Sequence, residues 1–508
     1  MSLAPVYIVS ATRTPIGTFL GSLSELTAPQ LGSVAIKAAI ERAKIAPDMV
    51  NEVFMGNVLS AGIGQAPARQ ASLGAGVPNT VPCTTVSKVC GSGLQSVVFG
   101  TRAIALGDAD IVVAGGMESM SNAPYYLKKA RNGYRMGNGE IVDGMIFDGL
   151  WDPYNNYHMG NAGELCAREM KYTREAQDAF AMESYRRALA AQKEGKFAAE
   201  MVSVSVPQRK GDAIVVSEDE EPGRGNPSKM GQLKPAFTKD GTITAANASK
   251  IDDGASAIVL ASEKAVKEHG LTPLGRIVGY GSAAQAPEWF TTAPAKAIDE
   301  TTARLGIKKS DIDLYEINEA FAVVTMACAD KCGIDLAKVN VNGGAVALGH
   351  PIGSSGARIL ATLVHAMGAR GAKRGLATLC IGGGEAVALV VERLAFTGHG
   401  RLGALGCRAV SNCGCRRLGR RGRTRSCPPS LASASRMARS RSPASRVTRS
   451  CSSRMRPGAA GSLLARWRAV TRRWSRRSRP RRSSAWVATT ARTPKRWAAT
   501  CPKSRCSS

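Results

Sequence analysis

The chain carries one pattern of strands and helices twice, and this internal repeat restricts its fold more than any other feature. In the first copy, a Gly-Ser-Gly turn at 91–93 opens a helical pattern that leads to the apolar run 111–116. In the second copy, Gly-Ser-Ser-Gly at 353–356 opens a helical pattern that leads to the run 377–384. Both runs end in glycines. Strands alternating with helices in two similar units predict an α/β fold made of two duplicated halves.

The other elements of each half follow from short apolar runs, which predict strands, and from amphipathic stretches, which predict helices. In the first half we expect strands at 5–10, 53–58, 84–89 and 110–115, and helices at 31–42 and 94–106. In the second half we expect strands at 276–281, 313–318, 338–343, 375–381 and 385–391, and helices at 293–305, 320–332 and 354–367.

Residues 121–247 interrupt this rhythm. The segment contains a stretch with Lys and Gly, two charged helices expected near 173–196, and the loop 217–234. Long excursions from a regular core commonly carry ligand contacts, so we expect an inserted loop domain that takes part in binding.

The C-terminal tail differs in composition from everything before it. From 395 to 508 the chain has 27 Arg, 2 Lys and no Asp or Glu, so the tail carries the whole formal net charge of +29 and residues 1–394 are formally neutral. A charge argument for nucleic-acid binding therefore applies to the tail alone.

The composition of this tail admits two interpretations. Arginine pairs interleaved with tryptophans, such as Trp467 and Trp474, are the residues with which an RNA-binding arm contacts phosphates and stacks bases. Selected basic tails usually mix Lys with Arg, however, and this one also lacks Ile, Tyr and Gln, which is typical of GC-rich DNA read in a wrong frame. We interpret residues 395–508 as a disordered product of a frameshift or sequencing error and do not expect nucleic acid as a partner.

Cysteine usage and the N-terminus indicate the compartment. The six cysteines before residue 395 form no dense disulfide framework, and those near 407–427 lack zinc spacing, so no metal is expected. Residues 1–9 lack the charged start and long apolar core of a signal peptide, and no run approaches the ~18 uninterrupted apolar residues of a membrane span. We expect a reducing, cytoplasmic setting without a membrane partner.

Cys90 is the first candidate for chemistry, because it lies where a strand ends and a helix begins. The positive end of the helix dipole favours an anion, so the thiolate is expected to be more populated than at the usual cysteine pKa of about 8.5. Gly91 and Gly93 leave room beside the sulfur for a carbonyl group. A buried structural cysteine before a flexible turn is the alternative at this point.

Three further motifs lie at element ends, where sites are usually built: Asn318 to Phe321, Gly349 to Gly353 around His350, and Cys380 to Gly384. Each by itself also fits a packing role. Together with Cys90 they supply a nucleophilic thiol, a second thiol able to move a proton, an imidazole and an amide, which are the parts for acyl transfer and carbon acid chemistry.

The four motifs, in this order, resemble those of the thiolases. They read Val-Ser-Lys-Val-Cys-Gly-Ser-Gly-Leu, Asn-Glu-Ala-Phe, Gly-His-Pro-Ile-Gly and Cys-Ile-Gly-Gly-Gly, and the resemblance runs from Val6 to Leu394. It implies a five-layer αβαβα fold: an N-terminal half of residues 1–120 and 248–272, a CoA-binding loop domain of residues 121–247, and a C-terminal half of residues 273–394.

The resemblance also implies catalytic roles. Cys90 would carry the acyl group as a thioester, and Cys380 would take a proton from the methyl group of a second acetyl-CoA. His350 would activate Cys90 and, with a water held by Asn318, stabilise the enolate. The backbone N–H groups of Cys90 and Gly382 would form a second oxyanion hole.

Within this family the chain is most similar to the short-chain type, in which a methionine fills the space of a longer acyl tail. The resemblance places the substrate and CoA-binding residues at Leu150, His158, Met159, Arg224, Phe237, Ser249 and Phe321. It implies reversible Claisen condensation of two acetyl-CoA to acetoacetyl-CoA and CoA, no further cofactor, and a homo-oligomer built as a dimer of dimers. The aromatic residues, Met159 and His158 also fit ordinary packing.

Alternatives remain at this point. A broad or long-chain 3-ketoacyl-CoA thiolase would use the same catalytic residues, and the bulky segment 286–290 leaves the acyl length open. A ketoacyl synthase is disfavoured, because it normally has His where this chain has Cys380. An RNA-binding protein acting through its tail is the alternative from a different class.

Overall fold

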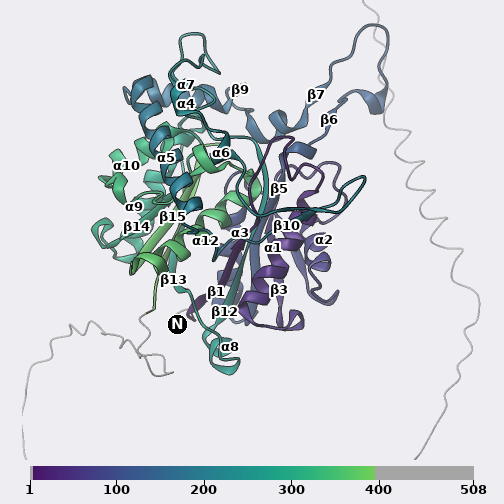
Figure 1. Cartoon of the computed structure of the whole chain (residues 1–508), viewed down its shortest axis with the longest axis vertical. Coiled ribbons are helices and arrows are strands. Elements are labelled where there is room, and N and C mark those ends of the chain that lie inside the picture. The colour runs from purple at the N-terminus through teal and green to yellow at the C-terminus, as the bar shows by residue number, and fades with distance from the viewer. Residues whose placement is uncertain (1–3, 395–508) are drawn as a thin grey trace, which may run out of the picture. The chain divides into compact units, whose positions relative to one another are not determined.

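Ten strands form one mixed sheet in the computed structural model, which describes residues 4–394 (Figure 1). The strand order is β14-β15-β16-β13-β1-β12-β5-β3-β4, with β2 paired to β12. The strands are β1 (Val6–Arg13), β2 (Gly17–Thr18), β3 (Glu52–Gly56), β4 (Cys83–Val86), β5 (Ile111–Ser119), β12 (Asp252–Ser262), β13 (Gly275–Ala284), β14 (Leu314–Ile317), β15 (Arg374–Ile381) and β16 (Glu385–Glu392).

The two ends of this sheet repeat one topology. From β1, the neighbours β12 and β5 are antiparallel and β3 and β4 follow in parallel; from β13, β16 and β15 are antiparallel and β14 follows in parallel. The two half-sheets meet where β1 pairs with β13 at Val6–Ile277 through Ile8–Gly275. The duplication expected from the sequence is confirmed.

The prediction of a strand at 338–343 is wrong. This segment touches β14 through a single bridge, between Tyr315 and Val339. Asn340 has φ +47°, and its side chain accepts the Ile317 N–H at 2.9 Å and donates to the Ile317 carbonyl at 2.8 Å. A side chain therefore makes the hydrogen bonds that a fifth strand would have made.

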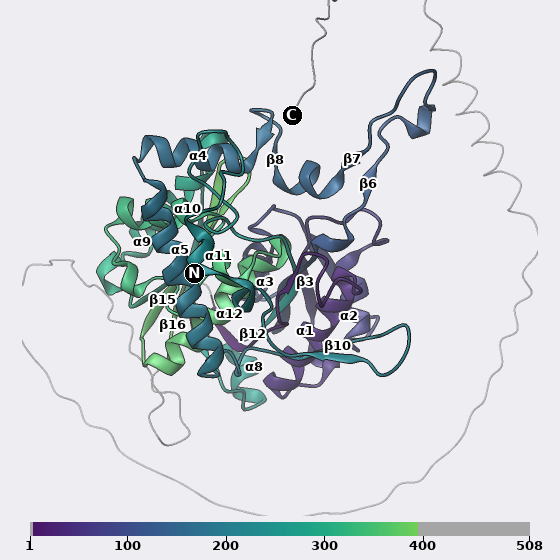
Figure 2. The ribbon, with the colours of Figure 1, turned by 45° about the horizontal axis from the view of Figure 1, so that its top comes forward.

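Helices cover both faces of each half-sheet and produce five layers, which confirms the predicted fold class. Helices α1 (Ala28–Ala43) and α2 (Pro67–Gly74) cover the outer face of the first half, and α9 (Ala293–Leu305) and α10 (Ala322–Cys332) cover that of the second. The central layer consists of α3 (Ser92–Leu106) and α12 (Ile352–Arg370), which share one buried cluster with both half-sheets (Figure 2). The remaining helices are α4 (Met159–Glu169), α5 (Arg174–Lys193), α6 (Glu221–Arg224), α7 (Pro227–Met230), α8 (Glu263–Glu268) and α11 (Ala345–Leu348).

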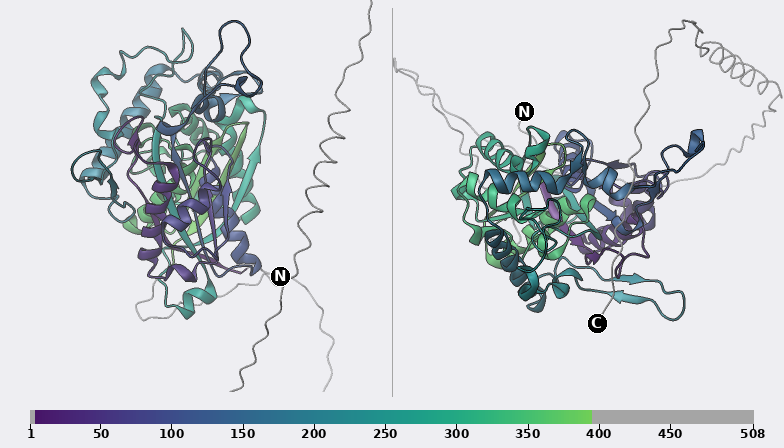
Figure 3. Two further views of the ribbon diagram at one scale, coloured as in Figure 1. Left: turned by 90° about the vertical axis from the view of Figure 1, so that its right-hand side faces the viewer. Right: turned by 90° about the horizontal axis from the view of Figure 1, so that it is seen from above.

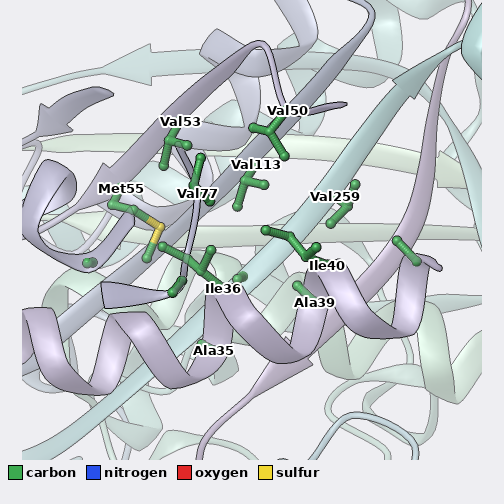
Figure 4. Packing of buried hydrophobic residues seen from close by; sticks show 14 of the residues in the cluster. Ala35, Ile36, Ala39, Ile40, Val50, Val53, Met55, Val77, Val113 and Val259 are labelled. Atoms are coloured by element: carbon green, nitrogen blue, oxygen red, sulfur yellow. The ribbon is translucent and has the colours of Figure 1, made fainter. Parts of the chain in front are cut away.

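In the outer layer, one face of α1 packs on one face of the strands β3 and β5. Ile36 and Ile40 are one turn apart on α1 and pack on Met55 of β3 and Val113 of β5 (Figure 4). The neighbour of Val113 on β5, Val112, points the other way into the central layer. Because both faces of the strand are buried, its sequence is continuously apolar.

Helix α3 also explains the most apolar segment of the described residues. Among residues 4–394, only Val89–Leu106 is long and apolar enough to cross a membrane by composition, with a mean hydropathy of 1.2. In the fold, 67% of this segment is buried. A helix with a sheet on either side needs an apolar surface all round.

The segment between β5 and β12 is built from short hairpins and helices: β6 (Tyr125–Tyr126) with β7 (Val142–Asp143), β8 (Trp151–Asp152) with β9 (Tyr157–His158), β10 (Val204–Val206) with β11 (Ile214–Val216), and α4 to α7. The β6–β7 arm and the β10–β11 hairpin project from the layered core (Figure 3).

The prediction of two helices near 173–196 is wrong, because α5 is one continuous helix. The Thr173 side chain caps the start of α5 by accepting the Ala176 N–H. No residue between Arg174 and Lys193 has a positive φ, and the next residue that has one is Gly195, beyond the end of the helix. The predicted disordered tail, 395–508, lies outside the described residues.

Candidate active site

The internal repeat brings Cys90 and His350 together. Each lies two residues before a central helix, Cys90 before α3 and His350 before α12. The two helix starts are in direct backbone contact at glycines: a Cβ on Gly93 would lie 2.8 Å from the Ala357 nitrogen, and one on Gly356 would lie 2.4 Å from the Leu94 nitrogen. Any larger residue at these positions would separate the two helix starts.

A tight turn presents Cys90. Val89 has φ +46°, and the Ser92 hydroxyl holds the turn by accepting the Lys88 N–H at 2.8 Å and donating to the Val89 carbonyl at 2.7 Å. A Cβ on Gly91 would lie 2.4 Å from Cδ1 of Ile381. Glycine thus lets the Cys90 turn approach the end of β15, where Cys380 lies.

The expectation of a stabilised thiolate at Cys90 is wrong. Burial raises the pKa of this thiol to about 12, although hydrogen bonds from the backbone of Cys90 and Gly382 oppose the rise. The N–H groups of Gly91 and Ser92 are already bonded to the carbonyls of Lys88 and Val89. Desolvation outweighs the helix dipole here, so the resting nucleophile is a neutral thiol that needs a base.

His350 is held in one orientation and tautomer. Its backbone N–H donates to Oδ2 of Asp252 at 2.7 Å, and its Nδ1 lies 2.6 Å from the Ser355 hydroxyl. That hydroxyl donates to the Pro351 carbonyl at 2.9 Å, so it accepts a hydrogen bond from Nδ1–H. The lone pair of the imidazole is therefore assigned to Nε2.

Asn318 approaches this free nitrogen. Its Nδ2 lies 3.5 Å from Nε2 of His350, and its own backbone N–H donates to the Thr378 carbonyl. Oδ1 of Asn318 is buried and has no hydrogen-bond partner within residues 4–394. Burial, aided by the charge of Arg358, lowers the pKa of His350 to about 3, so the imidazole is neutral at ordinary pH and can act as a base.

Cys380 lies near the end of β15 and is 1% exposed. Burial raises its pKa well above the ordinary value, and the neighbouring Cys90 raises it further. The turn after the strand contains Gly383 and Gly384 at φ +88° and +87°. This turn places the Gly382 N–H on Cys90. The five predicted catalytic residues are therefore brought to one place.

Aromatic side chains extend from this center. The His158 ring stacks on Phe237 with centroids 4.8 Å apart, and Phe237 meets Phe321 edge-on at 5.9 Å. Ser249 joins the group, because its N–H donates to the Ala320 carbonyl at 3.0 Å.

Met159 and Leu150 link the binding residues to the two thiols. Met159 packs in the cluster that contains Cys380, and its Cε would lie 3.7 Å from a Cβ on Gly382. Leu150 packs with Cys90 in another cluster. Six of the seven predicted binding residues thus lie in or next to the packed surroundings of the catalytic group.

Arg224 is the exception. Its guanidinium is exposed and donates to Oε1 of Glu220 at 3.2 Å. Oε2 of Glu220 binds Ser22 and the Thr18 N–H, on the side of the first half-sheet. Within residues 4–394, the structure does not bring Arg224 to the aromatic group.

His158 also has a structural contact. Its Nδ1 accepts the Gly160 N–H at 3.0 Å and so caps α4. This leaves the proton on Nε2, which is the nitrogen available as a donor to a ligand. Burial lowers the pKa of His158, which keeps the ring neutral.

Three residues that hold the site were not predicted from the sequence: Ser355, Asp252 and Glu118. Glu118 is fully buried and accepts the N–H groups of Val58, Leu59 and Gly353, tying the loop after β3 to the start of α12. Burial raises its pKa to about 7. The available signal was a carboxylate at the end of a mainly apolar run, as at Glu118 and Asp252.

The duplicated five-layer fold and a two-thiol, one-imidazole site define a thiolase. Residues 6–264 match the family described as thiolase, N-terminal domain, and residues 271–393 match thiolase, C-terminal domain. The chain belongs to the thiolase family, as its motifs predicted.

Curated relatives and a solved structure indicate which kind of thiolase the chain is similar to. The chain is 54% identical over 390 residues to the acetyl-CoA acetyltransferase of Schizosaccharomyces pombe, covering 77% of this chain and 99% of the relative. It is 54% identical over 392 residues to that of Cupriavidus necator, covering 77% and 100%. A crystal structure of a thiolase from Ascaris suum in complex with coenzyme A aligns with a TM-score of 0.73 at 46% identity, covering 77% of this chain and 100% of that one.

Proposed function

We propose that the chain is an acetyl-CoA acetyltransferase, which condenses two acetyl-CoA to acetoacetyl-CoA and CoA and catalyses the reverse thiolysis. The observation that carries this proposal is the meeting of two thiols, half-buried Cys90 and buried Cys380, at the Gly382 N–H, where the helix start of Cys90 touches the helix whose start holds His350 in one orientation. One thiol can hold an acyl group while the other moves a proton. The relatives named acetyl-CoA acetyltransferase support the same substrates.

In the first half-reaction, Cys90 gives its proton to Nε2 of His350 as its sulfur attacks the thioester carbonyl. The C–S bond to CoA breaks, and the leaving CoA thiolate takes the proton of Cys380. The acyl-enzyme then contains an imidazolium and a Cys380 thiolate. Because all three groups are neutral at rest, this charge separation exists only while the acyl group is bound.

In the second half-reaction, the Cys380 thiolate takes a proton from the methyl group of the second acetyl-CoA. The imidazolium of His350 and a water on Asn318 stabilise the enolate oxygen, which is essential because a thioester α-proton is very weakly acidic. The enolate carbon attacks the acyl carbonyl, whose oxygen is bound by the N–H groups of Cys90 and Gly382. The Cys90 sulfur leaves and recovers the proton from His350.

Bulky side chains around Cys380 support a short acyl substrate. Phe290 is 2% exposed, packs in the same cluster as Cys380 and Met159, and lies with its ring 6.5 Å from that of Phe321. The segment 286–290, whose effect on acyl length the sequence left open, thus fills space beside the proton-moving thiol. A longer acyl tail would have to displace these side chains.

The test is thiolysis of acetoacetyl-CoA and of a ten-carbon 3-ketoacyl-CoA by the full chain, with the Cys90→Ser variant as the matched control. We expect the four-carbon substrate to be turned over at least tenfold faster and the variant to be nearly inactive. A preference for the longer substrate would support a broad or long-chain 3-ketoacyl-CoA thiolase instead. Substantial turnover by Cys90→Ser would exclude Cys90 as the nucleophile.

Assembly and location are part of the proposal. The β6–β7 arm exposes Tyr125, Leu127 and Ile141, with Ile141 65% exposed, and exposed apolar groups of this kind are typical of a surface covered by another subunit. We propose a homotetramer, which light scattering of the full chain tests. A relative from Gibberella zeae, 52% identical over 394 residues, is named a cytosolic enzyme, which supports the cytoplasm as the location.

A further inference from the structure

Lys250 is a partly buried lysine whose ammonium group binds two backbone carbonyls. Its Nζ donates to the Ala248 carbonyl at 2.9 Å and to the Val346 carbonyl at 3.0 Å. The same nitrogen lies 5.6 Å from the centroid of the Tyr185 ring, on α5. An ammonium group is strongly hydrated in water, so its burial costs free energy that two neutral acceptors offset only in part. At this cost, Lys250 joins three segments that are far apart in the sequence.

The two carbonyls belong to segments that contain predicted site residues. Ala248 directly precedes Ser249, one of the predicted CoA-binding residues. Val346 lies on the four-residue helix α11, which ends two residues before His350. Lys250 therefore connects the CoA-binding segment to the segment that presents the catalytic imidazole.

Val346 is held at both of its backbone groups. Its N–H donates to Oε2 of Glu319 at 3.1 Å, and its carbonyl accepts the hydrogen bond from Lys250. Glu319 directly follows Asn318 and is 1% exposed. The last carbonyls of a helix lack partners inside that helix, and a cation near them is favourable. Lys250 supplies this cation at the end of α11.

Asp252, two residues after Lys250, holds the other end of the same stretch of backbone. Its Oδ2 accepts the His350 N–H at 2.7 Å. Gly349 permits this approach, because its φ is +104° and a Cβ there would lie 2.5 Å from Oδ2 of Asp252. Lys250 and Asp252 thus bind the backbone at two points four residues apart, Val346 and His350, and together they fix the turn that leads into the imidazole.

The charges around the ammonium group agree with this role. Burial lowers the pKa of Lys250, whereas the negative charges of Glu221, Asp252 and Glu319 act in the opposite direction. Burial also raises the pKa of Asp252, and the positive charge of Lys250 opposes that rise. A cation at this position therefore favours the ionised form of the carboxylate that binds the His350 N–H.

We propose that Lys250 is a positioning residue for the thiolase reaction: its ammonium group locks the segment that presents His350 to the CoA-binding segment around Ser249. This inference rests on the proposed function. Without the ammonium group, the Val346 carbonyl is released and the turn before His350 loosens. The imidazole then accepts the Cys90 proton less effectively, although Lys250 itself does not touch the reacting atoms.

The test measures two reactions of Cys90 in the full chain. One is its single-turnover acetylation at saturating acetyl-CoA. The other is its alkylation by iodoacetamide, followed by mass spectrometry of the peptide that contains Cys90, which needs a base but no turnover. Lys250→Ala removes the ammonium group and leaves space for methylammonium, whereas Lys250→Met removes it and fills the space. Lys296→Ala is the matched control, because Lys296 on α9 also donates to a backbone carbonyl, that of Ala284, at 2.8 Å.

We expect both reactions to slow about tenfold or more in Lys250→Ala and Lys250→Met, because small displacements of a catalytic group cost rates of this order. Lys296→Ala should keep the wild-type rates. Methylammonium chloride should restore most of both rates in Lys250→Ala and should not affect Lys250→Met. Tetramethylammonium chloride at the same ionic strength should restore neither variant, because it has no N–H donor.

Wild-type rates in Lys250→Ala would overturn the proposal. A loss that methylammonium does not restore would also overturn it, because the lysine would then serve folding alone. If Lys250→Ala does not fold, Lys250→Met is compared with Lys250→Arg, which keeps a charged donor, and equal losses in these two variants would overturn the proposal. A wild-type chain that is alkylated at Cys90 but does not turn over acetyl-CoA would contradict the proposed function alone.

Discussion

Removing the base beside Cys90 is the most direct test of the site. The thiol has a pKa of about 12, and His350, with a pKa of about 3, is neutral above pH 4. At pH 8 the unaided thiolate is populated to about 1 part in 10⁴, which corresponds to about 5 kcal/mol at 1.36 kcal/mol for each pKa unit. His350 supplies this activation by accepting the proton only as the C–S bond forms.

We therefore expect His350→Ala to slow acetylation of Cys90 by about 10³- to 10⁴-fold, within the range that a general base contributes. The wild-type rate should be flat from pH 5 to 9, because the base form of His350 is fully present throughout. The variant depends on hydroxide, and its rate should rise about tenfold per pH unit up to pH 10, since the pKa of Cys90 lies above this range.

The assay is a single turnover of acetyl-CoA by the full chain in a quenched-flow instrument, with released CoA measured by chromatography. Phe99→Leu, on the helix beside the site but outside the catalytic group, is the control and should keep the wild-type profile. A His350→Ala variant that loses less than tenfold, or whose rate does not change with pH, would refute the role of His350 as the base.

Four further predictions test other parts of the structure. Cys380→Ser should still acetylate Cys90 but lose at least 10²-fold in condensation, as a comparison of single-turnover and steady-state rates would show; equal losses in both would contradict the division of roles. Gly160→Ala would place a Cβ 2.4 Å from the Phe237 ring, and we expect an overpacking cost of about 1–3 kcal/mol that appears as a raised KM for CoA. Arg13→Ala would leave Glu200 and Asp219 buried without their cation and should destabilise the fold by about 3–5 kcal/mol in urea unfolding; a loss below 1 kcal/mol would mean that water replaces the guanidinium. Burial raises the pKa of Glu118 to about 7, so its protonated form contributes stability below pH ~4.5 that is lost as pH rises to 7, and Glu118→Gln should flatten the fall in Tm over this window.

The local sequence was enough to predict much of the fold. Helix α9 begins and ends where predicted, at Ala293 and Leu305, because an amphipathic run is followed by Gly306 at φ +65°. The motifs around Cys90, His350 and Cys380 were found because each occupies the end of a strand or the start of a helix, which short-range patterns mark. The strand predicted at 338–343 failed because a side chain, that of Asn340, replaced the ladder.

The sequence by itself determined the duplicated halves, the identity of the reacting groups and the family. Only the tertiary structure decided their protonation states. The position of Cys90 at a helix start predicted a thiolate, whereas desolvation leaves a neutral thiol at Cys90 and a neutral imidazole at His350. Asp252 and Glu118 reach the start of α12 from strands far away in the chain, and desolvation of the site depends on all such contacts together. A local pattern of residues cannot predict this desolvation, because it arises only once the two halves have packed around α3 and α12.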